Sequence, residues 1–419
     1  MAMGEWKEYR LGDFMEFNPK ESIKKGTVAR KITMDLLVPH SRDIYDYVYE
    51  PYSGGAKFRN GDTIMARITP CLENGKHAFI SLLDDGEVAY GSTEYFVMRG
   101  KEGISDNRFV YYLTHTPEFK ATAIKSMVGS SGRQRAQVEV LENMVMTLPE
   151  SLEEQRAIAS QLSEIDDKIA NNKHICEALD EQAQAIYKDW FVDLSPYSDG
   201  TNSSSEIKIP QGWKIGVFDD IIEETVSGDW GNDYLKGNYT HKVACIRGCD
   251  FQDVKFGLRG KTPERYILEK NFQSKRFHDK DILVEISGGT STVSTGRVCP
   301  ISQTLIDKYD GDVVCTNFCK VVRPSGSYGA YAYYTWLHKY NKKIMFAYEN
   351  GTSGIKNFRI KDFTSREPIY IPCEKDVMLF QDMIDSIHQQ IQTIGSESLS
   401  LGRLRDILLT KLMGGEIKL

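Results

Sequence analysis

Much of this chain is present twice, with the same landmarks in the same order. Trp6-Lys7 opens the first copy and Trp213-Lys214 opens the second. Three further pairs of segments follow in register: Phe58–Asp62 with Phe277–Asp281, Gly129–Gly132 with Gly351–Gly354, and Leu148-Pro149 with Ile371-Pro372. The offset within these pairs grows along the chain, so the copies differ in loop length. Two copies are too few for a solenoid. A duplicated domain instead predicts a pseudo-symmetric molecule that recognises a target with two halves.

The composition indicates a globular chain whose acidic surplus is concentrated in one segment. A length of 419 residues predicts about two to four domains. The hydrophobic fraction of 41% and the aromatic fraction of 11% suffice for packed cores. The formal net charge of −7 argues against a uniformly basic nucleic-acid binder. Ten acidic and four basic residues lie between Glu150 and Trp190, so the two copies are close to neutral.

The eight cysteines lack the spacing of a disulfide framework, and the N-terminus carries no secretory signal. The chain has no stretch approaching the ~20 consecutive apolar residues that a membrane span requires. These features predict a cytoplasmic protein with reduced thiols and no membrane association.

Each copy reads as a mixed α/β domain. In the first copy, short strands are expected at 76–80, 87–90 and 95–99, separated by glycine-containing turns. Short helices are expected at 108–115 and 117–127. The segment from Ser195 to Glu206 is polar and aperiodic, which is typical of a linker. The predicted domains are 1–149, a central helix at 150–193, a linker at 194–209, a second domain at 210–372 and a C-terminal helix at 373–419.

Residues 158–190 show the spacing of a coiled coil. Positions in this segment alternate steps of four and three residues, and nine of the ten are apolar. Ser151 and Glu154 form a predicted capping box at the start of the helix. The ten positions are Ile158, Leu162, Ile165, Ile169, Asn172, Cys176, Leu179, Ala183, Ile186 and Trp190.

A second helix with the same spacing follows the second copy and is expected to end at Gly414-Gly415. Gly395 and Gly402 interrupt it, so the sequence leaves open whether this helix is continuous. Its positions are Val377, Phe380, Ile384, Ile387, Ile391, Ile394, Ser398, Leu401, Arg405, Leu408 and Leu412.

Either helix alone would expose a stripe of isoleucine and leucine, so each needs a partner. Antiparallel pairing of the two helices satisfies both stripes, and the alternative is that each helix folds back on its own domain. The predicted fold class is therefore α+β: two similar α/β domains joined by two long antiparallel helices in a coiled coil, with a pseudo-twofold internal duplication. The residues expected to pair are Ile158, Leu162, Ile165, Ile169, Leu179, Ile186, Phe380, Ile384, Ile387, Ile391, Ile394 and Leu408.

Several strings in the chain resemble the specificity subunits of type I restriction-modification systems. Glu154–Ile158, Leu162 and Asp166–Ile169 resemble the central region of that family, and Tyr187–Asp193 closes it. Ile209–Trp213 resembles the entry into the family's second target recognition domain. Each string is weak alone, but their order and the duplication make the resemblance specific, and it covers the whole chain.

The resemblance implies a non-catalytic subunit in which each recognition domain reads one half of a split double-stranded DNA target. The paired helices would fix the gap between the halves and dock two methyltransferase subunits. These partners would bring S-adenosylmethionine and methylate adenine, and restriction subunits would use ATP and Mg²⁺. The second helix departs from the family pattern at Gly395, Gly402 and Arg405, which leaves the equality of the two docking sites open.

Motifs for catalysis are absent from the sequence. It contains no phosphate-binding Gly-x-x-x-x-Gly-Lys-Ser/Thr loop, no Asn/Asp-Pro-Pro-Tyr/Phe string of an adenine methylase and no Gly-x-Gly-x-x-Gly fingerprint. We therefore expect no cofactor in this chain. Cys245, Cys249, Cys315 and Cys319 suggest zinc, but buried apolar thiols are the favoured interpretation and no metal site is predicted. Cys315 and Cys319 are expected on one strand, facing the same way.

The two echoed glycine-rich loops are the strongest candidates for DNA contact. Their side chains include arginine and glutamine in one copy and lysine and asparagine in the other, which can pair with the edges of guanine and adenine. Different side chains on a shared frame would suit two different half-sites, whereas an ordinary solvated connection is the alternative. The loops comprise Gly129, Ser130, Ser131, Gly132, Arg133, Gln134 and Arg135, and Gly351, Thr352, Ser353, Gly354, Ile355, Lys356 and Asn357.

Further candidates are weaker. The polar segment Ser287–Thr292, which includes Gly288 and Gly289, is suited with Arg297 to phosphate contact, and an ordinary glycine turn is equally compatible. Single polar or charged residues complete the set, although such residues are usually solvated: Arg67, Lys76, Thr93, Arg247 and Asn317.

The sequence thus predicts a DNA-reading subunit, and the alternative is a non-catalytic bivalent scaffold that binds protein partners. Because the two copies are close to neutral, tight DNA binding is expected to need the methyltransferase subunits.

Overall fold

The computed structural model describes residues 5–39, 41–197, 209–351, 355–417 and 419. The chain divides into two compact units. Unit 1 contains residues 1–169 and 401–419, and unit 2 contains residues 170–400. Part of the predicted linker, 198–208, lies outside the described residues, and the 3₁₀ turn η1 (Ser195–Tyr197) precedes it.

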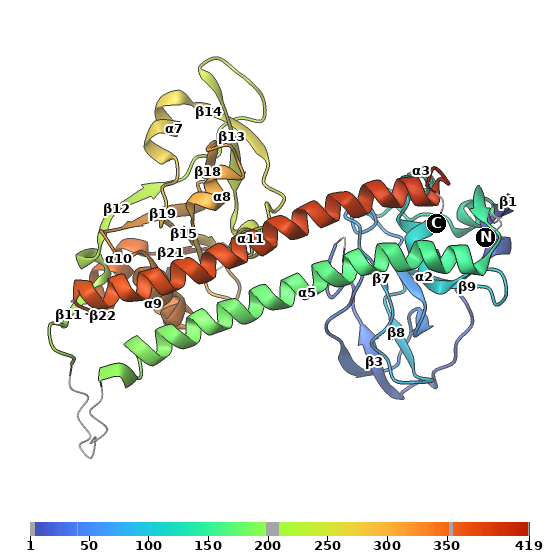
Figure 1. Ribbon diagram of the computed structural model, residues 1–419, viewed down its shortest axis with the longest axis horizontal. Helices are drawn as coiled ribbons and strands as arrows, with labels where there is room; N and C mark the ends of the chain where they lie inside the picture. The colour runs from blue at the N-terminus through green and yellow to red at the C-terminus, as the bar shows by residue number, and fades with distance from the viewer. Residues whose placement is uncertain (1–4, 40, 198–208, 352–354, 418) are drawn as a thin grey trace. The chain divides into compact units, whose positions relative to one another are not determined.

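Unit 1 combines a two-stranded sheet, β1-β10, with two four-stranded sheets in the orders β2-β9-β6-β7 and β4-β3-β8-β5 (Figure 1). Its strands are β1 (Trp6–Arg10), β2 (Met15–Phe17), β3 (Val28–Ile32), β4 (Val48–Pro51), β5 (Lys57–Arg59), β6 (Thr63–Ala66), β7 (His77–Phe79), β8 (Val88–Gly91), β9 (Tyr95–Gly100) and β10 (Val145–Pro149). Its short helices are α1 (Leu11–Phe14), α2 (Asn107–His115), α3 (Pro117–Lys125) and α4 (Val138–Glu142). The strands and helices expected in this copy therefore correspond to β7, β8, β9, α2 and α3.

Unit 2 repeats this arrangement with sheets in the orders β11-β22, β12-β19-β15-β17, β14-β13-β18 and β16-β21-β20. Its strands are β11 (Lys214–Val217), β12 (Ile222–Ser227), β13 (Tyr239–Ile246), β14 (Glu264–Leu268), β15 (Ile282–Glu285), β16 (Ser287–Gly288), β17 (Val298–Pro300), β18 (Val313–Cys315), β19 (Cys319–Pro324), β20 (Glu349–Asn350), β21 (Lys356–Phe358) and β22 (Pro368–Ile371). Its helices and 3₁₀ turns are η2 (Phe218–Asp220), η3 (Gly248–Asp250), α6 (Phe251–Lys255), α7 (Glu269–Lys275), α8 (Gln303–Asp307), α9 (Gly329–Asn341), η4 (Ile344–Tyr348) and α10 (Ile360–Arg366).

The duplication extends to strand register. Thr63 of β6 faces Met98 of β9, and Ile282 of β15 faces Val322 of β19, at corresponding places in the two copies. The two copies also share a parallel pair within an otherwise antiparallel sheet, β3 with β8 and β13 with β18. The predicted internal duplication is therefore confirmed at the level of topology.

The echo around Phe58–Asp62 and Phe277–Asp281 marks a buried ion pair. Asp62 is fully buried and accepts two hydrogen bonds from Arg99, at 2.6 and 2.7 Å. Asp281 accepts two from Arg323, at 2.9 and 3.2 Å. Each aspartate directly precedes a strand of the four-stranded sheet, and its arginine lies on the neighbouring strand. A buried carboxylate requires such a partner, which explains why the aspartate appears in both copies.

The paired tryptophans fasten each copy to its long helix. Trp6 Nε1 donates to Glu154 at 2.8 Å, and Trp213 Nε1 donates to Asp376 at 2.8 Å. Both acceptors lie in the first helical turn. The predicted capping box is only half correct: the Ser151 hydroxyl accepts from the Glu154 amide at 3.4 Å, but the Glu154 carboxylate binds Trp6 instead of returning to Ser151.

The two long helices are each continuous and run antiparallel. They are α5 (Leu152–Phe191) and α11 (Glu374–Met413). In unit 2, the Cys176 thiol lies 3.8 Å from the Ile391 carbonyl oxygen, and Tyr187 packs near Phe380. In unit 1, Asp166 of α5 binds Arg405 of α11 at 2.8 Å. The predicted antiparallel pair is confirmed, and no helix among the described residues is long and apolar enough to cross a membrane.

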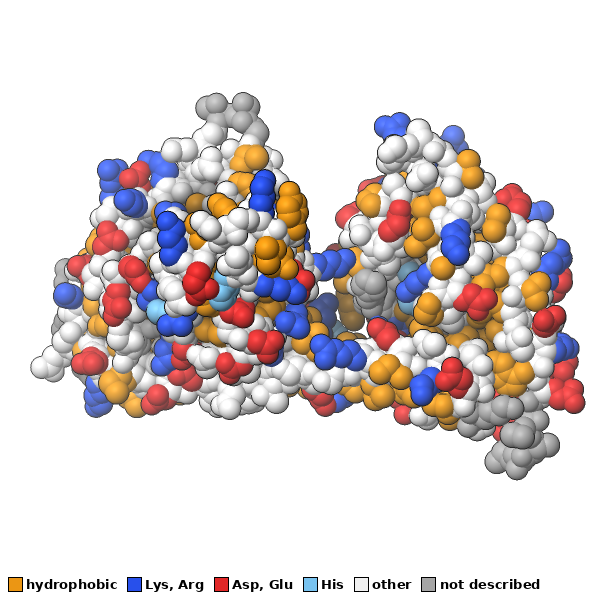
Figure 2. Space-filling view, turned by 90° about the horizontal axis from the view of Figure 1, so that it is seen from above, with side chains coloured by type: hydrophobic (Ala, Val, Ile, Leu, Met, Phe, Trp, Pro, Cys, Tyr) orange, Lys and Arg blue, Asp and Glu red, His pale blue; other side chains and the backbone are white. Residues whose placement is uncertain are grey.

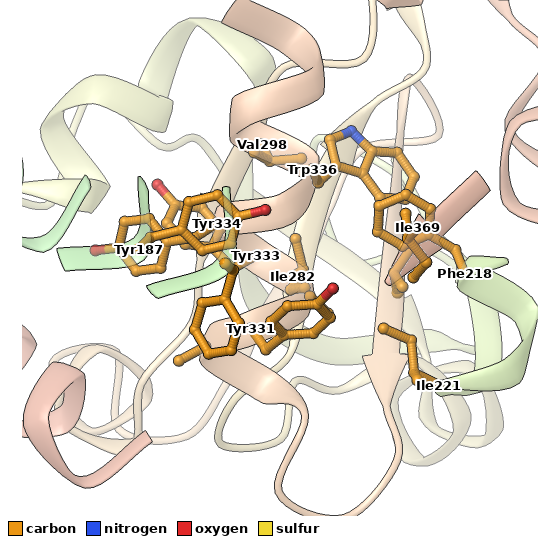
Figure 3. Packing of buried hydrophobic residues seen from close by; sticks show 14 of the residues in the cluster. Tyr187, Phe218, Ile221, Ile282, Val298, Tyr331, Tyr333, Tyr334, Trp336 and Ile369 are labelled. Carbon is orange, nitrogen blue, oxygen red and sulfur yellow. The ribbon is translucent and has the colours of Figure 1, made fainter. Parts of the chain in front are cut away.

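Each helix also packs on the domain beside it. The apolar stripes are therefore covered both by the partner helix and by the adjacent domain. In unit 2, Tyr187 meets the α9 residues Tyr331 and Tyr334 in a cluster that extends to Trp336 (Figure 3). In unit 1, Ile158 and Leu162 share a core with the end of α11. Of the residues expected to pair, Ile158, Leu162, Phe380, Ile384, Ile387 and Ile391 are buried, and Ile165, Ile169, Leu179, Ile186, Ile394 and Leu408 are half-buried.

Polar residues within the helix pair have polar partners. The buried amide of Asn172 donates to Glu397 at 2.7 Å and to Ser398 at 3.2 Å. Arg405, which departs from the family pattern, binds Asp166, and Asp166 also accepts from the Tyr112 hydroxyl at 2.7 Å. These contacts favour one register, because a shifted helix would leave buried polar groups unpaired.

In unit 2, His388 occupies the position that corresponds to Asp166 of unit 1. The Tyr334 hydroxyl lies 2.9 Å from His388 Nε2. Burial lowers the pKa of His388 to about 4, so its imidazole is neutral near pH 7. The same tyrosine–helix contact is therefore made by an ion-paired carboxylate in one unit and by an uncharged ring in the other.

The two glycines of α11 have different surroundings. A Cβ atom on Gly395 would lie 2.2 Å from the Phe256 carbonyl oxygen and 2.6 Å from Gly257 Cα. A Cβ atom on Gly402 would meet nothing within 4 Å. Gly395 thus permits the loop after α6 to reach the helix, and Lys308 Nζ binds the same loop at the Gly257 carbonyl oxygen at 2.7 Å.

We expect Gly395→Ala to lower the free energy of unfolding by ~1–3 kcal/mol, because the new methyl group collides with backbone that cannot move aside cheaply. Gly402→Ala is the matched control, and it should stabilise the protein by up to ~1 kcal/mol because alanine favours helix more than glycine does. Denaturant unfolding of both variants measures the difference. Equal effects of the two substitutions would contradict this assignment.

Candidate nucleic-acid interface

The two echoed glycine-rich loops have the same strand pairing and the same backbone conformation at their first glycine. In unit 1, Arg135 forms β-bridges with Ile68 and Val128. In unit 2, Asn357 pairs with Ser287 on one side and Asn350 on the other. The first glycine of each loop has a positive φ, 133° at Gly129 and 124° at Gly351, which side chains other than glycine rarely adopt. The predicted equivalence of the loops therefore extends to strand pairing and backbone conformation.

In unit 1, a carboxylate holds the base of the loop. Arg135 donates to Glu94 through Nε and Nη2 at 2.7–3.0 Å, and Arg67 Nε lies 3.6 Å from the same carboxylate. The hydrogen bonds from Arg135 lower the pKa of Glu94. Arg135 and Arg67 are thus engaged within the protein. Arg133 is exposed, and its guanidinium has no hydrogen bond or ion pair with the described residues.

The remaining candidates of unit 1 differ in availability. Gly129, Ser130, Ser131 and Gly132 are exposed, and Gln134 is half-buried with its carbonyl oxygen bound to the Thr69 amide at 3.0 Å. Thr93 is exposed at the turn before β9. Lys76 is half-buried, and its ammonium donates to the Met34 carbonyl oxygen at 2.5 Å.

In unit 2, the second loop and the segment at Ser287 lie side by side. The Ser287 hydroxyl donates to the Asn357 amide oxygen at 2.9 Å, and Gly288 pairs with Lys356. Lys356 itself binds Glu349 at 2.9 Å. Asn357 is exposed beside this pair. Thr352, Ser353 and Gly354 lie outside the described residues.

Arg297, expected near phosphate, is held inside the unit. Its guanidinium makes two hydrogen bonds to the Glu285 carboxylate, at 2.7 and 2.8 Å, and one to the Gly248 carbonyl oxygen. Arg247 is similarly paired with Asp250 at 2.9 Å. Gly289 has a φ of 75° and precedes an exposed turn from Thr290 to Val293.

The expectation that Cys315 and Cys319 share one strand is wrong. Cys315 ends β18 and Cys319 begins β19, and a turn through Thr316, Asn317 and Phe318 separates them. The Cys319 amide donates to the Thr316 carbonyl oxygen at 3.0 Å, which closes the turn. As a result Asn317 and Phe318 are exposed. The thiols of Cys245, Cys315 and Cys319 are buried as expected, whereas the expectation was wrong for Cys249, which is exposed. Among the described residues no group of three or more metal-ligating side chains is assembled.

Three residues at these sites could not be predicted from the sequence. Glu94 was missed because its partner Arg135 lies far along the chain. Trp230 and Phe318 were missed because an isolated aromatic residue is usually part of a core, whereas both are exposed here. Acidic and basic side chains are interspersed on the visible surface of each unit, without a single large basic field (Figure 2).

Comparison with known proteins identifies relatives. Residues 3–181 match the family model of the type I restriction modification DNA specificity domain. The type I restriction enzyme MjaIX specificity subunit of Methanocaldococcus jannaschii is 24% identical over 76% of this chain and 70% of that protein. The HindI specificity subunit of Haemophilus influenzae is 22% identical over 99% of this chain and all 100% of that protein. These similarities confirm the resemblance that the motifs predicted.

A crystal structure of a type I restriction-modification S subunit from M. genitalium shares the fold. It aligns with a TM-score of 0.50 at 14% identity, over 99% of this chain and 97% of that chain. At this level of identity the similarity concerns the fold alone.

We expect Arg135 and Glu94 to be energetically coupled. Single and double alanine variants should give a coupling free energy of ~0.5–1 kcal/mol in denaturant unfolding, because the pair is only partly buried. Arg133→Ala is the control, and it should leave the free energy of unfolding within ~0.5 kcal/mol of the wild type. Additive effects of the two substitutions would show that the ion pair does not stabilise the loop.

Proposed function

We propose that this chain, which belongs to the type I restriction-modification specificity family by its first domain and its fold, reads a split double-stranded DNA target. Each unit would read one half-site, and the paired helices would set the gap between the halves. The observation that carries the proposal is the pair of equivalent loops, which expose Arg133 in unit 1 and Asn357 in unit 2 beside matching strand pairings. One frame with different polar side chains suits recognition of two different sequences.

We infer that methyltransferase subunits bind along the helices. On α11 several large apolar side chains are exposed away from the paired face, and exposed apolar groups of this kind favour a protein partner. Such a partner would also add the positive charge that the two nearly neutral copies lack, so tight DNA binding would require the assembled complex. The exposed residues are Met378, Leu379 and Met383 in unit 2, and Leu404 and Ile407 in unit 1.

The chain would act as a non-catalytic subunit. S-adenosylmethionine would be bound by the methyltransferase subunits, and ATP with Mg²⁺ by the restriction subunits. The whole assembly would work in the cytoplasm, where its DNA target is.

Methylome sequencing of a host that carries this chain and its methyltransferase tests the proposal. We expect a modified adenine within a motif of two specified halves separated by a fixed gap. Arg133→Ala should relax selection in one half by ~1–3 kcal/mol if the side chain contacts a base, and Asn357→Ala should relax the other half. Loss in both halves from either single variant, or a continuous motif, would contradict reading by separate units.

Helix length offers an independent test. Insertion of one heptad into both α5 and α11, at the level of Ile169 and Leu401, should keep the helices paired and lengthen each by ~10 Å. The gap in the methylated motif should then grow by ~3 base pairs at 3.4 Å each. Insertion into α5 alone is the control, and it should abolish methylation because the polar contacts lose register. An unchanged gap after the double insertion would exclude the helices as the spacer.

A further inference from the structure

Unit 2 contains an open hollow of about 500 Å³ beside the strand that carries Ser287. Its lining includes Trp230, Phe318, Asn317 and Glu285. The volume lies within the ~300–1,000 Å³ typical of sites for small organic groups. The hollow therefore offers space for one planar ring system, next to the loop that we assign to DNA.

Two exposed aromatic rings border this hollow. Trp230 is 38% exposed and Phe318 is 55% exposed. Aromatic side chains fixed at a surface contribute most when a partner covers them, since their area is large and few torsions must be ordered. Rings are also the side chains on which nucleobases stack.

The backbone holds both rings in place. The Phe318 amide donates to the Thr316 hydroxyl at 3.0 Å, and its carbonyl oxygen accepts from the Ile286 amide at 2.9 Å. The Trp230 carbonyl oxygen accepts from Arg265 Nε at 2.8 Å, and the Arg265 guanidinium lies 4.2 Å from the indole centroid. Arg265 thus supports one face of the indole as a cation–π partner.

Close packing joins the Trp230 loop to the Phe318 turn. A Cβ atom on Gly228 would lie 2.0 Å from the Thr316 carbonyl oxygen, so only glycine fits there. The Asp229 amide donates to the Cys315 carbonyl oxygen at 2.8 Å. The two aromatic residues therefore sit on one rigid frame.

Polar groups at the hollow divide into engaged and available ones. Glu285 is occupied by Arg297, as described above. The side-chain amide of Asn317 is exposed and has no hydrogen bond to the described residues. A free amide of this kind can donate and accept at the edge of a base.

We propose that this hollow receives one base of the half-site read by unit 2, unstacked from the duplex. Trp230 and Phe318 supply stacking surfaces, and Asn317 contacts the edge of the base. The stacking offsets the free-energy cost of removing the base from the DNA duplex. This inference rests on the proposed function.

Unit 1 has different chemistry at the matching turn. Glu94 directly precedes β9 as Phe318 directly precedes β19, and Glu94 binds Arg67 and Arg135. We therefore assign base uptake to the half-site of unit 2 alone.

The test uses the complex of this chain with its methyltransferase. The DNA is a duplex that carries the motif identified by methylome sequencing. Abasic sites are placed singly along both strands of the unit 2 half-site, and dissociation constants are compared. An abasic site opposite the base that enters the hollow should tighten wild-type binding, since the base no longer has a pairing partner to leave. Phe318→Leu and Trp230→Leu should lose this tightening and bind the intact duplex about 10-fold more weakly.

Two controls accompany these variants. Phe318→Tyr keeps the ring and should bind as the wild type does. Ile215→Ala removes another exposed apolar side chain of unit 2 and should also have no effect. Because Phe318 is exposed, Phe318→Leu should leave the fold intact. This variant therefore decides the result if Trp230→Leu unfolds.

The possible outcomes distinguish failure of base uptake by unit 2 from failure of the proposed function. A wild-type complex that prefers the motif but shows no tightening at any abasic position, or a Phe318→Leu complex that equals the wild type, overturns the inference and leaves the proposed function intact. A wild-type complex that binds the motif no better than a scrambled duplex overturns both.

Discussion

Two buried polar contacts between the long helices hold the structure in one register. Asn172 binds Glu397 and Ser398 in unit 2, and Asp166 binds Arg405 in unit 1. A stripe of isoleucine and leucine alone would tolerate displacement by a heptad, because apolar contacts are non-directional. A displaced helix would leave the buried Asn172 amide without its acceptors and would separate the buried Asp166 carboxylate from Arg405. These contacts therefore select the arrangement in which each segment of one helix faces a defined segment of the other.

Comparison of the two copies distinguishes the contacts that both share from the side chains that differ between them. Both have a tryptophan bound to the first turn of a long helix, a buried aspartate–arginine pair and a glycine at the start of the glycine-rich loop. The side chains around that loop then diverge: Glu94 and two arginines gather in unit 1, whereas Trp230 and Phe318 flank a hollow in unit 2. Shared folding constraints thus coexist with two different surfaces.

Periodicity and punctuation in the sequence predicted much of this fold. The spacing from Ile158 to Trp190 predicted α5, and the strand expected at 95–99 corresponds to β9. The continuity of α11 could not be predicted, because the role of Gly395 depends on a loop at Phe256 that reaches it only in the folded unit. The ion pair between Glu94 and Arg135 and the turn between Cys315 and Cys319 were missed for the same reason. Spacing along the chain reports local structure, whereas these features arise from contacts between distant segments.

The last turns of α11 belong to the core of the first unit, and this has a consequence for synthesis. Leu409, Leu412 and Met413 pack with Ile158 and Leu162, and Gly415 reaches the ring of Trp6. The ribosome makes the first domain long before these residues emerge. That domain must therefore wait with part of its apolar surface uncovered until α11 has been made. A product truncated before Leu401 would lack part of the core that holds the first-made domain together.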